Sequence, residues 1–339
     1  MGTVSRDDIK EFLASRRARI TPQQAGLTAY GRNRRVPGLR REEVAMLAGV
    51  SIDYYTRLER GNLSGVSDTV LEALAGALQL DEAERGHLFD LARASASPCR
   101  PRRRAAGRVR PGLLHLLEAM TDAPAFVCNG RLDVLAANRL GRALYSLALE
   151  GSALESAALA GSAAGGSAAG SGPGGSGPRG SGPGGSGPAG PAHAGSAAPS
   201  SARPANIARF AFLDPRAADF YANWDEVANT TVALLRTEAG RDPCDRGLSD
   251  LVGELATRSE PFRVRWAAHD VRLHQTGVKH FHHPVVGDLA LGFEAVPLPA
   301  DPGLTLTAYS AEPGSAAQDA LQLLASWSAT PTTRTPNPA

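Results

Sequence analysis

The sequence has few of the features that mark membrane or secreted proteins. Its 339 residues contain no run of about 18 consecutive apolar residues, which argues against an ordinary membrane-spanning helix. The N-terminal stretch MGTVSRDDIKEFLASRR lacks the apolar core of a secretory signal. Only three cysteines occur, Cys99, Cys128 and Cys244, and their spacing predicts neither a disulfide framework nor a paired metal site. We therefore expect a cytoplasmic protein with no membrane partner.

Motifs of catalysis and metal binding are also missing. The sequence has no G-x-S-x-G, no H-E-x-x-H and no P-loop, so we expect no enzyme activity and no cofactor. Five of the eight histidines lie in HDVRLHQTGVKHFHH, where His280 and His282 would share one face of a strand. A first-row metal site needs three or four convergent ligands. No carboxylate or thiolate is spaced to complete this set, so we expect no metal.

Aromatic residues are absent between Tyr145 and Phe210, and this gap divides the chain. The stretch is made of Gly, Ser, Ala and Pro, which cannot bury enough apolar surface to offset the entropy of ordering. We expect a disordered insertion over 151–204. The remaining boundaries that we expect are an N-terminal domain over 1–95, a basic linker over 96–110, a second domain over 111–327 and a disordered tail over 328–339.

The net charge of +2 is unevenly distributed. Residues 1–110 carry 20 Lys and Arg against 13 Asp and Glu, a net charge of +7, and the rest of the chain carries −5. A basic N-terminal part predicts a polyanionic partner for that part alone. The alternative is that a high arginine content reflects only GC-rich coding.

Residues 1–95 have the pattern of successive capped helices. Ser5, Ser51, Ser67 and Asp81 each precede an apolar periodic segment, as helix N-caps do. In LRREEVAMLAGVSIDYYTRLERG, one helix ends at Gly49 and the next begins after Ser51. This order is the helix-turn-helix plan, in which the second helix enters the major groove of DNA.

Double-stranded DNA is therefore the partner that we expect for this domain. The third helix presents Arg57 outward for guanine and Ile52 for a thymine methyl, whereas Tyr55 packs inward. The alternative is that Arg57 only pairs with Asp53 or Glu59. The residues expected to contact bases or phosphates are Arg40, Arg41, Ser51, Ile52, Asp53, Tyr54 and Arg57, with Arg32, Arg34 and Arg35 from the preceding loop.

At this point the sequence resembles a known family. Residues 6–93 resemble the Xre-type, phage-repressor-like helix-turn-helix proteins, and RRVPGLRREEVAMLAGVSIDYYTRLERG is similar to the form found in MmyB-like regulators. The words FRVRWAAHDVR, GVKHFHHPVVGDLAL and LTLTAYSAEPGS match the same family. The resemblance implies an all-α, five-helix, repressor-like domain followed by an α+β, PAS-like ligand-binding domain. The insertion over 151–204 departs from the family pattern.

Beyond residue 110 the pattern predicts helices and strands together. We expect a hairpin around Asn129-Gly130, a helix capped by Asp214, and strands from Phe262 to Ser310. A PAS-like sheet with flanking helices can enclose an apolar pocket. The candidate lining residues are Phe126, Trp224, Trp266, Lys279, Phe281, His282, Phe293 and Tyr309. Lys279 or a nearby histidine would meet the anionic head of an amphipathic metabolite or fatty acid, although each aromatic residue is equally compatible with plain core packing.

These features together predict a sequence-specific, ligand-responsive transcription regulator. We expect a homodimer, because repressor-like helix-turn-helix domains bind two DNA half-sites. As a DNA-binding protein it would be associated with the nucleoid. The alternative is a DNA-binding adaptor whose second domain binds a partner protein instead of a small molecule.

Overall fold

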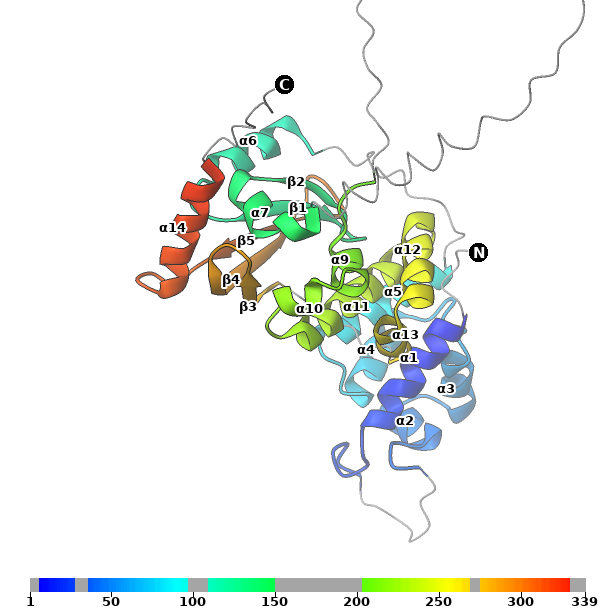
Figure 1. Cartoon of the computed structure of the whole chain (residues 1–339). Helices are drawn as coiled ribbons and strands as arrows, with labels where there is room; N and C mark the ends of the chain where they lie inside the picture. Colours follow the sequence, from blue (N-terminus) through cyan, green and yellow to red (C-terminus); the bar gives the residue numbers. More distant parts are fainter. Residues whose placement is uncertain (1–5, 28–35, 97–108, 150–202, 269–274, 330–339) are drawn as a thin grey trace, which may run out of the picture.

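The computed structural model describes residues 6–27, 36–96, 109–149, 203–268 and 275–329 as an N-terminal helical unit and a C-terminal α+β unit. The N-terminal helices are α1 (Arg6–Arg19), α2 (Arg41–Leu47), α3 (Ile52–Glu59), α4 (Asp68–Ala77) and α5 (Glu82–Ala96). The C-terminal strands are β1 (Ala125–Asn129), β2 (Val134–Ala137), β3 (Thr276–His283), β4 (Gly287–Pro297) and β5 (Leu304–Ser310). The C-terminal helices are α6 (Pro111–Ala119), α7 (Arg139–Leu144), α9 (Ile207–Leu213), α10 (Ala217–Phe220), α11 (Trp224–Arg241), α12 (Arg246–Arg258), α13 (Glu260–Ala267) and α14 (Ala316–Ala329). Figure 1 shows the sheet at one end of the protein and α2 and α3 at the other.

The caps that the sequence predicts begin the N-terminal helices. The hydroxyls of Ser51 and Ser67 accept hydrogen bonds from backbone amides of the first turns of α3 and α4. Asp81 and Glu84 form a reciprocal capping box, since the side chain of each accepts from the backbone amide of the other, at 2.8 and 3.1 Å. These three cap predictions are confirmed.

Two buried carboxylates bind the N-terminal helices together. Glu59, at the end of α3, pairs with Arg17 of α1 at 2.7 Å and also with Arg41 of α2. Glu84 of α5 pairs with Arg16 and Arg19 of α1 at 3.1 and 2.8 Å. Each carboxylate joins its own helix to α1, so removing one would take away two ion pairs at once and loosen how the helices are arranged.

The C-terminal sheet is antiparallel, with the strand order β2-β1-β5-β4-β3. Alternate residues point to opposite faces. The inner face carries Phe126, Phe281, Phe293 and Tyr309, and the helices α7, α9, α10 and α14 contribute to the same core. The outer face packs Val127 against Leu117 of α6.

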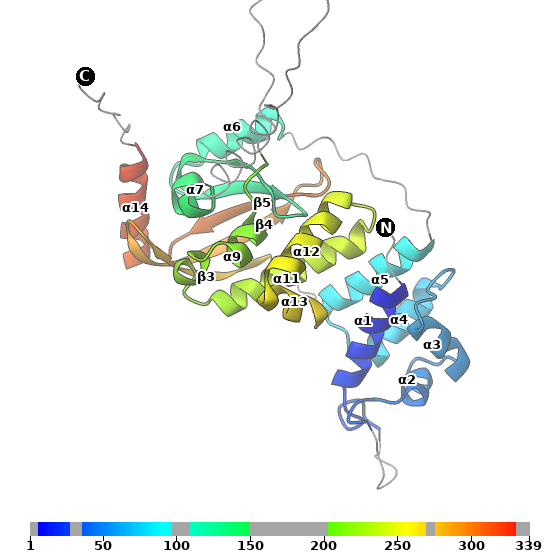
Figure 2. The same cartoon turned by 45° about the vertical axis from the view of Figure 1, so that its right-hand side comes forward.

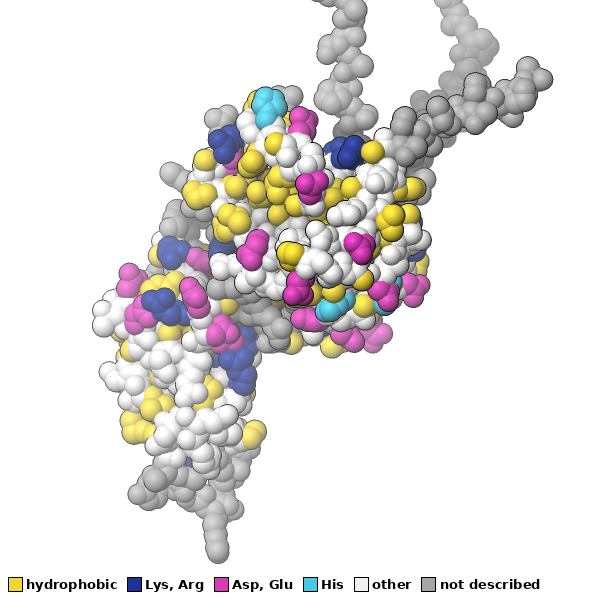
Figure 3. All heavy atoms as spheres, turned by 90° about the vertical axis from the view of Figure 1, so that its left-hand side faces the viewer, with side chains coloured by type: hydrophobic (Ala, Val, Ile, Leu, Met, Phe, Trp, Pro, Cys, Tyr) yellow, Lys and Arg dark blue, Asp and Glu magenta, His cyan; other side chains and the backbone are white. Residues whose placement is uncertain are grey.

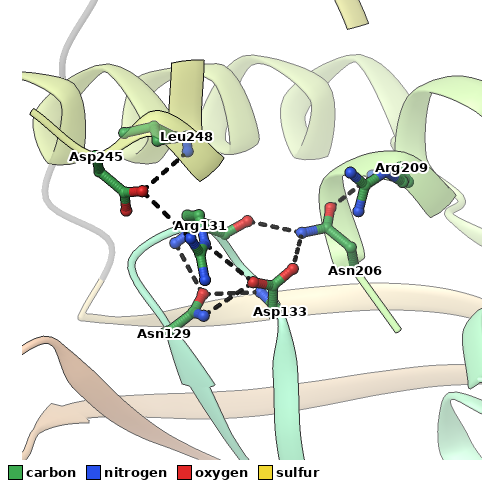
Figure 4. Close-up of polar contacts among 7 residues, drawn as sticks. All are labelled: Asn129, Arg131, Asp133, Asn206, Arg209, Asp245 and Leu248. Carbon is green, nitrogen blue, oxygen red and sulfur yellow. Dashed lines mark hydrogen bonds and ion pairs between the residues drawn. The ribbon is translucent and has the colours of Figure 1, made fainter. Parts of the chain in front are cut away.

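The chain joins the sheet again at Ala205–Ile207, next to the β1–β2 hairpin. The side chain of Asn206 donates to Asp133 and to the carbonyl of Arg131, both at 2.8 Å, and Arg131 also pairs with Asp245, the N-cap of α12 (Figure 4). Asn206 and Asp133 are both buried. This polar network fastens the chain on the far side of residues 150–202 to the hairpin.

Several local expectations were wrong. Asp214 does not cap a long helix: it ends α9, because the chain bends there and forms the short α10 before α11 begins at Trp224. Phe262 belongs to a helix, α13, which Ser259 caps and whose second residue is Pro261. Cys128 is a free, buried thiol.

Some expectations fall outside the described residues. They are the Ser5 cap, the loop arginines Arg32, Arg34 and Arg35, nearly all of the linker over 96–110, nearly all of the insertion over 151–204, and the tail from 330. In the part of the chain that the structure describes, no helix combines the length and apolarity needed to cross a bilayer.

Candidate functional site

The turn between α2 and α3 presents the start of α3 to solvent. Gly49 has a φ of +65°, a left-handed conformation that glycine adopts without strain, and it lets the chain reverse between the helices. Ile52 is 52% exposed although it is a large apolar residue, and Asp53 and Arg57 are exposed beside it. Tyr55 is fully buried in the helical core, as the sequence predicts. The outward side chains of α3 are thus free to meet another molecule.

Arg57 lies over the ring of Tyr54. Its guanidinium carbon is 4.8 Å from the ring centroid, a cation–π geometry that orients the side chain. Glu59, one alternative partner, faces inward and is 2% exposed. In the described part of the chain Arg57 forms no ion pair, so its donors remain available. Arg57 also borders a surface hollow together with Arg6, Arg60 and Asn62.

Two further arginines stand at the start of α2. Arg40 is the N-cap residue, and its backbone amide donates to Glu43 at 2.6 Å. Arg41 is bound to Glu59 through Nε, yet its side chain is 56% exposed. The start of α2 therefore carries two arginine side chains close to α3.

A cavity of about 260 Å³ lies between the inner face of the sheet and α11. Phe126, Lys279 and Phe293 come from the sheet, and α11 supplies a row of side chains at helical spacing. That row is Glu226, Val227, Thr230, Thr231, Leu234, Thr237, Glu238 and Arg241. The volume is slightly below the range of about 300–1,000 Å³ that is typical of small-molecule sites, so the cavity suits a small or slender ligand.

Lys279 is the cation that the sheet contributes to this cavity, beside Arg241 from α11. Its Nζ lies 5.1 Å from the centroid of Phe293 and donates to the Tyr309 hydroxyl at 3.4 Å. Burial lowers the pKa of Lys279 to about 8, because the apolar surroundings disfavour the ammonium. Glu226 and Glu238 also line the cavity, but among the described residues no carboxylate forms an ion pair with Lys279. Its charge is therefore available to an anionic group entering the cavity.

The thiol and phenol groups beside the cavity stay neutral near pH 7. Burial raises the pKa of the Cys128 thiol to about 12. The pKa values of the Tyr145 and Tyr309 hydroxyls, which share a hydrogen bond of 2.7 Å, are also raised by burial. Neither thiolate nor phenolate chemistry is thus favoured at this site.

The structure separates the predicted ligand residues into three groups. Phe126, Lys279 and Phe293 line the cavity. Phe281 and Tyr309 lie in the adjoining core, where the Tyr309 ring supports Lys279. Trp224, Trp266 and His282 do not line the cavity: Trp224 packs at the edge of the same core and donates to the Ala211 carbonyl, Trp266 stacks on Phe262, and His282 pairs with Asp288 on the outer face of the sheet.

Sequence reasoning missed the contribution of α11. Thr230, Leu234 and Thr237 are spaced by three or four residues, so they share one side of the helix. This spacing was visible in the sequence, but nothing in it showed that the face would meet a cavity. In the described ranges, no three His, Cys, Asp or Glu side chains gather as metal ligands would.

Comparisons with known proteins identify both units. A model of the MmyB-like transcription regulator ligand binding domain matches residues 109–159 and 187–324, which is more than half of the chain. A helix-turn-helix domain model matches residues 11–88. The first match leaves out residues 160–186, which lie within the Gly/Ser/Ala/Pro-rich stretch. A search of curated proteins gave no match.

Proposed function

Because the chain belongs to the MmyB-like transcription regulators and is a DNA-binding transcription regulator, we propose that it reads a specific DNA sequence under the control of a small molecule. Two observations carry this proposal: Arg57 on α3 is exposed and oriented by Tyr54, and the C-terminal unit has a cavity lined partly by aromatic side chains and by the half-buried Lys279. The first is suited to a base edge and the second to an anionic amphiphile.

For the DNA contact, we propose that α3 enters the major groove. Arg57 would reach O6 and N7 of a guanine, while Ile52 would meet a thymine methyl. Ser51, Asp53 and Tyr54 would border the same bases. Arg40 and Arg41, together with Arg32, Arg34 and Arg35 in the loop before α2, would contact the phosphates.

For the cavity, we propose a PAS-like architecture that binds an anionic amphipathic metabolite such as a fatty acid. The five-stranded sheet and the helices over its inner face support this assignment. The acidic head would pair with Lys279, and the apolar tail would pack on Phe126 and Phe293. The domain boundaries that we propose remain those predicted from the sequence.

A homodimer is part of this proposal, because two reading helices would match two half-sites about one helical turn apart. Figure 3 shows hydrophobic side chains gathered on the C-terminal unit. The exposed large hydrophobic residues of this unit include Leu114 and Leu116 of α6 and Leu323 and Trp327 of α14. A second subunit, or the partner protein of an adaptor, would cover such residues.

The test is a selection of random duplexes on the full chain, followed by sequencing, with native mass spectrometry of the same gently purified protein. We expect an enriched sequence with two related half-sites, and a dimer carrying an added mass of a few hundred daltons, roughly that of a drug-sized ligand. No enrichment over random duplexes would refute sequence-specific reading. A clean dimer that binds no added fatty acid would favour the adaptor.

A further inference from the structure

Helix α11 is the wall of the cavity that also reaches the N-terminal unit. Thr237, Glu238 and Arg241 in its last turn line the cavity. The same helix packs against α5, and Figure 2 shows the two helices side by side. A single turn of helix thus lies between the cavity and the domain that carries α3.

The contact between the two units is close at Gly240. A methyl group on Gly240 would lie 2.6 Å from Cε1 of His87 on α5, so only glycine lets the helices approach this far. Both residues are buried. Next to them Nε of Arg241, which lines the cavity, lies 3.5 Å from a carboxylate oxygen of Asp90 on α5.

His87 extends this contact into the helical core. Its ring meets Phe12 of α1 edge to face, with centroids 5.1 Å apart. Phe12 belongs to the same buried cluster as Tyr55 of α3. Helix α5 is also fixed to α1 through the ion pairs of Glu84 with Arg16 and Arg19. Because such cores are close-packed, a displacement of α5 also changes the arrangement of α1 and α3.

We propose that the last turn of α11 couples the cavity to the DNA-reading unit, through the contact of Gly240 with His87 and the ion pair of Arg241 with Asp90. The inference rests on the proposed function, since it needs a ligand in the cavity and DNA on α3. A ligand that contacts Thr237 and Arg241 shifts this turn between two positions. The affinity for DNA then changes only as far as the ligand binds one position more tightly than the other. Linkage requires that DNA change ligand affinity by the same factor.

The test compares two glycine-to-alanine variants of the full chain. Gly240→Ala puts a methyl group against the His87 ring, whereas Gly86→Ala, on α5 itself, puts one into open space. The probes are dodecanoate and a duplex selected on the wild-type chain. Anisotropy gives the Kd of the duplex with and without saturating dodecanoate, and calorimetry gives the Kd of dodecanoate with and without duplex.

For the wild type and Gly86→Ala we expect each ligand to change the Kd of the other by the same factor, about fivefold or more. For Gly240→Ala we expect a factor near one, with each ligand alone bound within about twofold of the wild type. His87→Ala removes the ring without adding bulk and is expected to give the same loss, which keeps the test valid if Gly240→Ala does not fold.

The inference is overturned if Gly240→Ala and His87→Ala both keep the wild-type coupling factor. It is also overturned if the wild type binds dodecanoate and duplex independently. A wild type that selects no duplex or binds no dodecanoate refutes the proposed function itself, and the coupling with it. The two failures are therefore distinguishable in one experiment.

Discussion

At the scale of the residue, Arg57 and Lys279 are the two cations on which the proposed function depends. Arg57 is exposed and held over Tyr54, so it can reach a base without first breaking an ion pair. Lys279 lies against Phe293 and Tyr309, and these apolar surroundings lower the pKa of its ammonium group. Their environments lead to different predictions.

Arg57→Ala is expected to weaken binding to the selected duplex by about 1–3 kcal/mol and to affect random duplexes far less. The reason is that a bidentate contact with guanine is lost while phosphate contacts remain. Anisotropy titrations at one fixed salt concentration measure both. Arg246→Ala on α12, whose side chain is exposed, is the matched control and should change neither. Equal losses on both duplexes would reduce Arg57 to a phosphate contact.

The affinity for dodecanoate is expected to fall as the pH rises above about 8, where free Lys279 loses its proton. Below that pH the ammonium is present and attracts the carboxylate; above it the attraction is absent. Lys279→Met should cost about 1.5–3 kcal/mol at pH 7 and remove this pH dependence. Calorimetry between pH 6.5 and 9.5 measures both effects.

The sequence holds only two lysines, so Lys10→Met is the matched control for this experiment. Lys10 is an exposed residue of α1, and its replacement should leave the pH profile unchanged. A profile that stays the same in Lys279→Met would exclude Lys279 as the contact for the carboxylate.

At the scale of the element, the end of α3 depends on a glycine that touches α1. Gly61 has a φ of +87°, and a methyl group there would lie 2.3 Å from the carbonyl oxygen of Arg6. Gly65 has a φ of +75° but open space around it. Comparing alanine variants of Gly61 and Gly65 therefore distinguishes the cost of backbone strain from the cost of steric overlap with α1.

Gly65→Ala is expected to cost about 1–2 kcal/mol of stability through its left-handed conformation alone. Gly61→Ala should cost about 1–3 kcal/mol more, because α1 must move away from α3. Urea denaturation followed by circular dichroism measures both. Equal losses of stability in the two variants would show that α1 moves away from the added methyl group at no energetic cost.

At the scale of the whole molecule, the stretch between the two parts of the C-terminal unit is expected to be dispensable. Its composition predicts no core, and the chain on its far side is fastened by Asn206 to Asp133 and Arg131. Shortening a loop between fixed ends changes stability only by the entropy of closure.

Deleting 155–200 should therefore leave duplex binding unchanged and raise stability by at most about 2 kcal/mol. Thermal unfolding and anisotropy measure this. Asn206→Ala, which leaves buried Asp133 without one of its donors, is the contrasting variant and should cost about 1–3 kcal/mol. A deletion that lowers the unfolding midpoint as much as Asn206→Ala would show that the stretch contributes to the fold.

The sequence by itself determined the local features of this protein. Caps at Ser51, Ser67 and Asp81 and the inward Tyr55 followed from hydrogen bonding and periodicity within a few residues. The tertiary structure alone decided that α9, α10 and α11 are separate, that Phe262 is helical, and that Thr230 and Arg241 face a cavity. These outcomes depend on packing between segments far apart in the chain, which no local pattern encodes. The approach of Gly240 to His87 is of the same kind, because it exists only where two domains meet.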